Sequence, residues 1–135
     1  MTHLTFNPWA IVVCAVIQWV LGAIWYSPVA FAKPWKAMVY AHSEPKKNNM
    51  IAGMIVSFLG SLILSFVLAH VILWASVTTP AHGALVGFIM WAGFIVAPLS
   101  AQHIYEGRPF NLFAINVGYW LVGLAISGVV LAVWR

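Results

Sequence analysis

Four long apolar stretches that contain no charged side chain constrain this chain more than any other feature. They run from about residue 8 to 27, 50 to 75, 82 to 104 and 111 to 134, and each has 20 or more residues without Asp, Glu, Lys or Arg. Because a helix rises about 1.5 Å per residue, each stretch can cross a hydrocarbon core roughly 30 Å thick. The sequence therefore predicts an all-α protein, an integral membrane four-helix bundle that forms a single membrane domain over residues 1–135.

The composition excludes the soluble classes. Only 6% of the residues are charged and 64% are hydrophobic, whereas a soluble domain carries roughly 25% charged residues. The aromatic share of 15% is far from the composition of a disordered chain. A transmembrane barrel needs alternating apolar and polar residues in stretches of about ten, and the sequence has no such alternation.

The basic residues predict how the chain is oriented in the membrane. Four of the six lie in the first connector, loop 28–49, and these are Lys33, Lys36, Lys46 and Lys47. Basic residues beside apolar spans mark the cytoplasmic side, so we expect loop 28–49 in the cytoplasm and both termini extracytoplasmic. This clustering beside the spans favours the lipid bilayer as a partner and argues against nucleic acid.

An alternative for the first stretch is a cleaved signal peptide, because Ala30-Phe31-Ala32 has the small-x-small pattern of a cleavage site. Against this, no Lys or Arg precedes the stretch, and the stretch is long for the apolar region of a signal peptide. We expect it to be retained as a transmembrane helix.

Small residues recur at helical spacing within the spans. The second stretch has one at every fourth position: Gly53, Ser57, Ser61, Ser65 and Ala69. The third contains Gly83-x-x-x-Gly87. Because lipid is as apolar as leucine, helices in a membrane associate through close packing at such positions. Packing inside one bundle accounts for most of these faces, and the others are available for a homo-oligomer or for other membrane subunits.

Few side chains are available for catalysis. The chain has no aspartate, its acidic side chains are Glu44 and Glu106, and Cys14 is its one cysteine. A Ser-His-Asp set is therefore impossible, and no phosphate-binding glycine loop or dinucleotide motif occurs. The uncharged spans also argue against a proton-coupled transporter. We expect a protein without catalysis of its own, and we predict no cofactor.

Polar and aromatic residues gather at the expected cytoplasmic side. The candidate ligand-binding residues there are Trp25, Tyr26, Lys33, Trp35, His103, Glu106, Arg108 and Asn116. One interpretation is a cap that closes the bundle, in which Glu106 pairs with Arg108 or reaches across to Lys33. The other is a site for an amphipathic molecule whose acidic head meets Lys33 or Arg108.

Three tryptophans nearer the middle of their spans, Trp19, Trp91 and Trp120, are candidates for lining an apolar ligand pocket. The alternative is that they fill space between helices.

Histidines offer a further possibility, because imidazoles on neighbouring helices can ligate haem or a transition metal. His70 and His82 flank the short second connector and are the best such pair. Without Cys or carboxylate partners, however, histidines at span ends are more often polar interface residues.

Segments in both halves of the chain carry a resemblance to a known family. In the first half these are Gly22-Ala-Ile-Trp25-Tyr26-Ser27-Pro28 and Phe31-Ala-Lys33-Pro34-Trp35. In the second half the matching segments are Gly83 and Gly87, Trp91-Ala-Gly93-Phe94, Glu106-Gly-Arg108-Pro109 and Asn116-Val-Gly118-Tyr119. Over nearly its whole length the chain resembles domain of unknown function 1761, a family of small bacterial membrane proteins. The resemblance implies a four-span bacterial inner-membrane protein, and it brings no established activity or catalytic residue.

Three functional hypotheses follow. The first is a homo-oligomeric structural unit, or an accessory subunit of a membrane complex, without catalysis. The second is binding or transport of an apolar or amphipathic small molecule or lipid. The third is a redox protein with haem or metal at His70 and His82.

Overall fold

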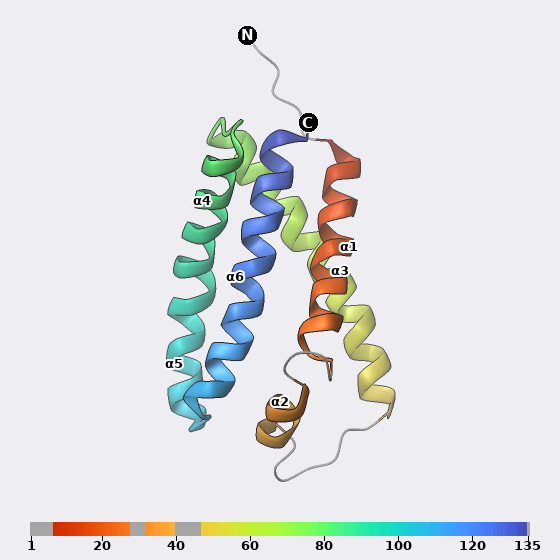
Figure 1. The fold of residues 1–135 in the computed structure, drawn as a ribbon, viewed down its shortest axis with the longest axis vertical. Coiled ribbons are helices and arrows are strands. Elements are labelled where there is room, and N and C mark those ends of the chain that lie inside the picture. The colour runs from red at the N-terminus through yellow and green to blue at the C-terminus, as the bar shows by residue number, and fades with distance from the viewer. Residues whose placement is uncertain (1–6, 28–31, 40–46, 135) are drawn as a thin grey trace.

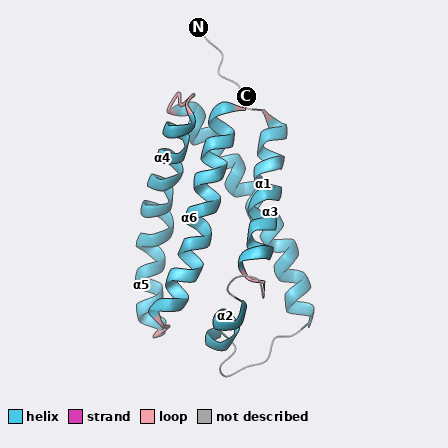
Figure 2. Ribbon diagram, in the orientation of Figure 1, coloured by secondary structure: helices cyan, strands magenta, loops and turns pink. Residues whose placement is uncertain are grey.

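The structure is a computed structural model that describes residues 7–27, 32–39 and 47–134. Glu44, Lys46 and both chain termini lie outside the described residues. Within them the chain forms helices and short loops and no strand (Figure 2). The elements are α1 (Pro8–Trp25), α2 (Ala32–Val39), α3 (Lys47–Trp74), α4 (Pro80–Trp91), the π-helical turn η1 (Ala92–Val96), α5 (Ala97–Glu106) and α6 (Phe110–Val133).

Four helical segments of the described chain are long and apolar enough to cross a membrane. They are Pro8–Trp25, Ile51–Trp74, Pro80–Glu106 and Phe110–Val133, and these bounds lie close to the ranges expected from hydrophobicity. The all-α membrane fold predicted from the sequence is therefore confirmed. Pro8 and Val133 lie at one end of the bundle, called here the terminal end, and α2 lies at the other, the α2 end (Figure 1).

Helix α2 is a difference from the sequence analysis, which treated residues 28–49 as a loop. Trp35 and Met38, one turn apart, are half-buried, whereas Lys33 and Lys36 are exposed. This spacing gives the short helix one apolar face. Pro34 falls in its first turn, where a missing N–H costs no helical hydrogen bond. The connector therefore contributes a helix that packs against α6.

The third span has an irregular middle that the sequence analysis did not predict. Residues Ala92–Val96 form the π-helical turn η1, and Pro98 follows in the first turn of α5. A proline inside a regular α-helix removes one hydrogen bond and clashes with the carbonyl four residues earlier. The wider turn just before Pro98 accommodates it, so α4 and α5 continue one another across the membrane.

Local sequence signals fix where two helices begin. Pro8 and Pro80 occupy the first turns of α1 and α4, where proline is well tolerated. The preceding residues, Asn7 and Thr79, accept hydrogen bonds from backbone N–H groups of those turns. Such capping satisfies donors that have no partner within the helix.

Helix α6 is the central helix of the bundle, because it contacts every other helix. It lies between the α4–α5 span and α1, and α3 runs obliquely to the others (Figure 1). The buried apolar core is formed by Ala10, Ile11, Cys14, Leu68, Ala69, Ile72, Val77, Leu124, Leu131 and Ala132. These residues come mainly from α1, α3 and α6.

Glycines allow α4 and α6 to approach backbone to backbone. A Cβ added at Gly83 would overlap the carbonyl oxygen of Gly128, and one added at Gly87 would overlap that of Leu124. A Cβ at Gly128 would in turn overlap the Gly83 carbonyl oxygen. The Gly83-x-x-x-Gly87 pattern is therefore used inside the bundle, as small residues in membrane helices commonly are.

Helices α1 and α6 run antiparallel and meet through larger side chains set on glycines. The amide of Gln18 lies against Gly123, at a position that any Cβ would occupy. One turn further along α1, a Cβ at Gly22 would lie 2.9 Å from the hydroxyl oxygen of Tyr119. That hydroxyl donates a hydrogen bond to the Gln18 carbonyl oxygen at 2.8 Å. The two glycines thus make room for the polar side chains of the opposite helix.

The small-residue stripe of α3 is divided between two environments. Ser61, Ser65 and Ala69 are buried against the rest of the bundle. Gly53 and Ser57, toward the α2 end, are exposed, and Gly53 has open space around it. The oblique course of α3 carries its first part away from the other helices. Only the second half of the small-residue stripe therefore packs against them.

Candidate functional site

Trp25 and Tyr26, the first two residues of the Trp25-Tyr26-Ser27-Pro28 (WYSP) segment, bind α6 at the α2 end. The Trp25 indole N–H donates to the Ile115 carbonyl oxygen at 2.9 Å. The Tyr26 hydroxyl donates to Asn116 Oδ1, also at 2.9 Å. The Tyr26 ring lies with its centroid 5.2 Å from that of Trp35. Four of the candidate residues therefore meet in one cluster, the WYSP cluster: Trp25, Tyr26, Trp35 and Asn116.

Local features of α1 explain why these side chains are presented to α6. Tyr26 is the residue at which α1 ends, and its backbone N–H bonds to the Gly22 carbonyl oxygen. Burial, and secondarily Tyr119 nearby, raise the pKa of Tyr26. A tyrosine phenol is protonated at neutral pH even without this shift, so Tyr26 is a hydrogen-bond donor there. A Cβ at Gly118 would lie 3.2 Å from the Trp25 ring, so the indole sits close on α6.

A second group of candidate residues lies at the turn between α5 and α6. Arg108 Nε and Glu106 Oε2 form an ion pair at 2.7 Å. The amide of Gln102 donates to Glu106 Oε1 at 3.1 Å. Gly107, with a φ of 67°, ends α5 in the left-handed conformation that glycine tolerates best. Of the two pairings open to Glu106, the structure has the one with Arg108.

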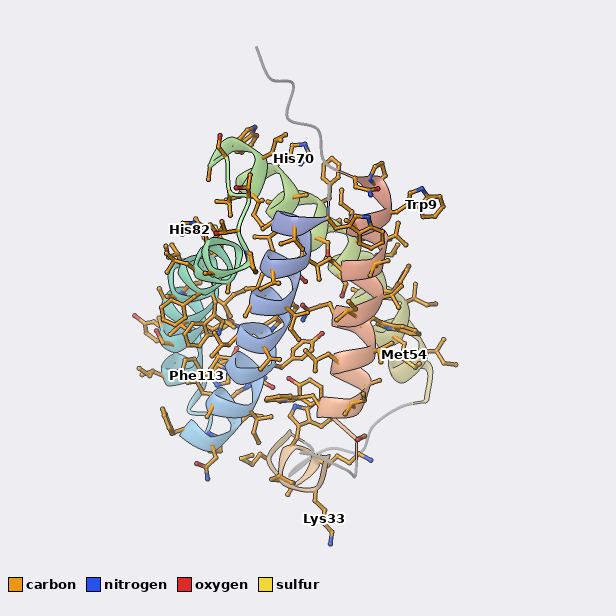
Figure 3. All side chains as sticks on the ribbon, turned by 45° about the horizontal axis from the view of Figure 1, so that its top comes forward. Trp9, Lys33, Met54, His70, His82 and Phe113 are labelled. Carbon is orange, nitrogen blue, oxygen red and sulfur yellow. The ribbon has the colours of Figure 1, made fainter. Side chains whose placement is uncertain are left out.

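The structure thus divides the eight candidate residues of this end. The WYSP cluster lies on the α1 side of α6, and His103, Glu106 and Arg108 lie on its α5 side (Figure 1). Lys33 belongs to neither group, because its side chain is exposed and extends away from the bundle at the α2 end (Figure 3).

Replacing Glu106 by glutamine is expected to lower the free energy of unfolding by no more than about 1 kcal/mol. The Glu106–Arg108 pair is partly solvated, with side-chain exposures of 37% and 48%, and such pairs contribute roughly 0–1 kcal/mol. Chemical unfolding in detergent measures the difference. A loss above about 3 kcal/mol would contradict the partly solvated geometry, because only a buried, unpaired partner costs that much.

The three mid-span tryptophans do not meet in one pocket. The Trp19 indole N–H donates to the Met54 carbonyl oxygen of α3 at 3.2 Å, whereas that of Trp91 donates to the Val117 carbonyl oxygen of α6 at 2.7 Å. Trp120 is half-buried, with its ring against that of Tyr119. Trp19 therefore links α1 to α3, whereas Trp91 links α4 to α6.

Trp19 also lines an apolar groove between α1 and the exposed part of α3. The pocket has a volume of about 550 Å³, and its lining residues are Trp19, Ile51, Met54, Ile55, Phe58 and Leu59. Met54 lies on the outer side of the bundle (Figure 3). The Trp19 ring packs edge-on against Phe58, and these two side chains connect α1 to this part of α3.

His70 and His82 lie at the terminal end, on α3 and α4 (Figure 3). Each has a local partner: Nδ1 of His70 lies 2.8 Å from the Phe66 carbonyl oxygen, and Nδ1 of His82 lies 2.8 Å from the Thr79 hydroxyl. Within the described residues, no three His, Cys, Asp or Glu side chains come together as metal ligands do.

Polar side chains without partners lie buried inside the bundle, and the sequence analysis did not predict them as a group and missed Gln18 altogether. Gln18, Ser65 and Ser127 have an exposed fraction of 0%. Both amide atoms of Gln18 and both hydroxyl oxygens lack hydrogen-bond partners. The signal that could have found Gln18 is its place as the one side-chain amide of an otherwise apolar first span.

The helices and their contacts define a multi-pass, all-α membrane protein. A family model described as "Protein of unknown function (DUF1761)" matches residues 9–132. The chain belongs to this family, in agreement with the resemblance carried by the WYSP segment. No curated protein and no solved structure matches the chain.

Proposed function

We propose that this protein is a non-catalytic building block of a membrane assembly and that it acts by associating with a second copy of itself through α3. The observation that carries the proposal is the exposure of residues 51–60 of α3, over which all side chains except that of Phe58 are exposed. This segment includes Gly53, Ser57 and Gly60, which we call the α3 small face. By helix geometry these three positions lie on one side of the helix.

The other glycines of the membrane helices support this interpretation. Those at positions 22, 83, 87, 118, 123 and 128 all have atoms of another helix where a Cβ would stand. Gly53 and Gly60, like Gly93 of the third span, have none within 4 Å. A glycine inside a helix costs roughly 0.5–1 kcal/mol relative to alanine. Close approach by another helix offsets this cost, and a lipid chain gains nothing from the absence of a Cβ.

The absence of catalysis is supported by what the polar side chains do. The hydroxyl of Tyr26 and the indole N–H groups of Trp19, Trp25 and Trp91 all bind atoms of another helix. Glu106 binds Arg108 and Gln102 at the turn that joins two spans. These are the contacts of a bundle held together by its own side chains.

The orientation that we propose follows the positive-inside rule. Lys33, Lys36 and Arg108 lie at the α2 end, and the described residues of the terminal end carry no Lys or Arg. The α2 end then faces the cytoplasm, both termini are extracytoplasmic, and the membrane is the bacterial inner membrane.

The groove at Trp19 favours a second candidate function, the binding of an apolar chain such as the acyl tail of an amphipathic molecule. Its volume of about 550 Å³ falls within the range of small-molecule sites, which is roughly 300–1,000 Å³. Met54→Trp would fill the groove, because Met54 is one of its lining residues. That change abolishes retention of an apolar ligand if this candidate is correct and leaves association through the small face intact.

Cysteine crosslinking tests the association directly, and Cys14, the chain's one cysteine, is first replaced by alanine. In that background Ser57→Cys is expected to form a disulfide-linked dimer when isolated native membranes are treated with a mild chemical oxidant, which takes up the two electrons released by the thiols. Ile55→Cys is the matched control, because Ile55 is equally close to the α2 end, is 57% exposed and lies on the opposite face of α3. Equal crosslinking at both positions would reflect random collision and would contradict the proposal.

Leucine substitutions at two positions of the small-residue stripe of α3 are expected to have different effects, one on the stability of the monomer and the other on dimer formation. Ser61 is 2% exposed, so Ser61→Leu forces extra volume into a packed interior and destabilises the bundle by about 1–3 kcal/mol. Ser57 is exposed, so Ser57→Leu leaves the monomer folded and removes the dimer. Thermal unfolding and size measurements in mild detergent report the two effects. A harmless Ser61→Leu would place that residue against lipid and contradict the packing described here.

A further inference from the structure

We propose that the pocket between α5 and the start of α6 binds the phosphate group of a membrane phospholipid. The pocket has a volume of about 240 Å³ and is lined by Ser100, His103, Ile104, Arg108, Phe110 and Phe113. It is smaller than the roughly 300 Å³ at which sites for whole small molecules begin. Its size suits a head group whose chains lie outside it. The site is separate from the α3 small face, and its occupation does not depend on the dimer.

One residue that lines this pocket, His103, has a buried polar atom without a partner. His103 is 8% exposed, and its Nδ1 is buried without a hydrogen-bond partner. The imidazole packs edge-on against the Phe113 ring, with the two centroids 5.1 Å apart. Leaving a buried nitrogen unpaired costs about 1–3 kcal/mol. Because Nδ1 has almost no accessible surface, the imidazole must turn toward the pocket for Nδ1–H to donate to a phosphate oxygen, which then supplies the missing partner.

Arg108, the cationic side chain that lines the pocket, is held in place by Glu106. Glu106 accepts from Arg108 Nε through Oε2 and from Gln102 through Oε1, so both of its carboxylate oxygens are engaged. The ion pair uses one of the five N–H donors of the guanidinium. The terminal nitrogens lie outside this pair, and a guanidinium offers phosphate the planar, two-pronged geometry that it binds best.

The start of α6 adds a third feature that favours an anion. Its N-cap residue is Pro109, which provides no side-chain hydrogen bond to the first turn. The first N–H groups of a helix have no partner within it, and the helix dipole makes this end positive. Phe110, at that end, lines the pocket. Helix starts of this kind bind phosphate groups.

The surroundings identify the source of the phosphate as lipid. The pocket lies where two membrane-spanning segments end and begin, at Glu106 and Phe110. Large apolar side chains beside it are exposed, Ile104 at 80% and Phe110 at 76%. Acyl chains that extend from a bound head group would cover these side chains. A soluble phosphate ion has no acyl chains and would leave the side chains of Ile104 and Phe110 uncovered.

Native mass spectrometry of the full chain in mild detergent tests the site with two probes, phosphatidylglycerol and diacylglycerol. We expect one tightly retained phosphatidylglycerol per chain and no retained diacylglycerol, which has the same chains without the phosphate. His103→Phe and Arg108→Gln are each expected to weaken retention about tenfold, the effect of losing one charge-assisted hydrogen bond. Phenylalanine preserves the ring contact with Phe113, so this variant should keep its fold.

Lys36→Gln is the matched control. It removes the same charge from an exposed position of α2 that is not among the lining residues of the pocket, and retention is expected to be unchanged. Equal retention of diacylglycerol, or equal loss in Lys36→Gln and Arg108→Gln, would overturn the proposal. Displacement of the lipid by millimolar inorganic phosphate would assign the pocket to a soluble anion and overturn the lipid source.

Discussion

Replacing Gly83 by leucine is expected to separate α4 from α6 and to lower the free energy of unfolding by at least about 3 kcal/mol. Even a Cβ at this position overlaps the carbonyl oxygen of Gly128 and the side chain of Ala132. The Gly128 atom belongs to the backbone, so no change of rotamer relieves the clash. Because α6 is the helix that contacts all the others, the effect reaches the whole bundle. Thermal or chemical unfolding in detergent measures it.

Gly93→Leu provides the matched control in the same span. Gly93 is exposed and has no atom of another helix within 4 Å of the position that a Cβ would take. Its substitution is expected to leave the stability unchanged or to raise it by up to about 1 kcal/mol, because it meets no other helix and removes the cost of a glycine within a helix. If the two variants unfolded alike, the close contact between α4 and α6 would be wrong.

Gln18→Met is expected to raise the stability of the bundle by about 1–3 kcal/mol. Both amide atoms of Gln18 are fully buried without a hydrogen-bond partner, and methionine replaces the amide by an apolar group of similar length. Chemical unfolding in detergent measures the change.

Gln102→Met serves as the control for Gln18→Met. Gln102 is exposed, and its amide makes one hydrogen bond, to Glu106. Its replacement is expected to change stability by no more than about 0.5 kcal/mol. A loss of stability in Gln18→Met would mean that the Gln18 amide has a partner inside the membrane, and the interior described here would be incomplete.

The spans were predictable from sequence because their length and lack of charge depend on the membrane alone. The face that each helix turns inward was not, since a helix that is apolar all round carries no amphipathic signal. The stripe from Gly53 to Ala69 illustrates this: its pattern is uniform, yet only the part from Ser61 onward is buried. The direction in which α3 crosses the bundle decides the difference.

The candidate residues at the α2 end show the same limit. The polar and aromatic types were recognisable, and the pairing of Glu106 with Arg108 was one of two alternatives. Their separation into the WYSP cluster and the α5–α6 turn depends on α6 lying between them, which no local sequence pattern encodes. Gln18 was missed because a single uncharged amide does not shorten an apolar span. Its importance comes from burial against Gly123.

The central claim is that the chain associates with a second copy through the α3 small face. A native mass spectrum of the protein released from mild detergent tests it most directly. We expect a species of twice the mass of one chain for the native sequence and a single chain for the Ser57→Leu variant. A native protein that remains a single chain, or a dimer that persists unchanged in Ser57→Leu, would contradict the account.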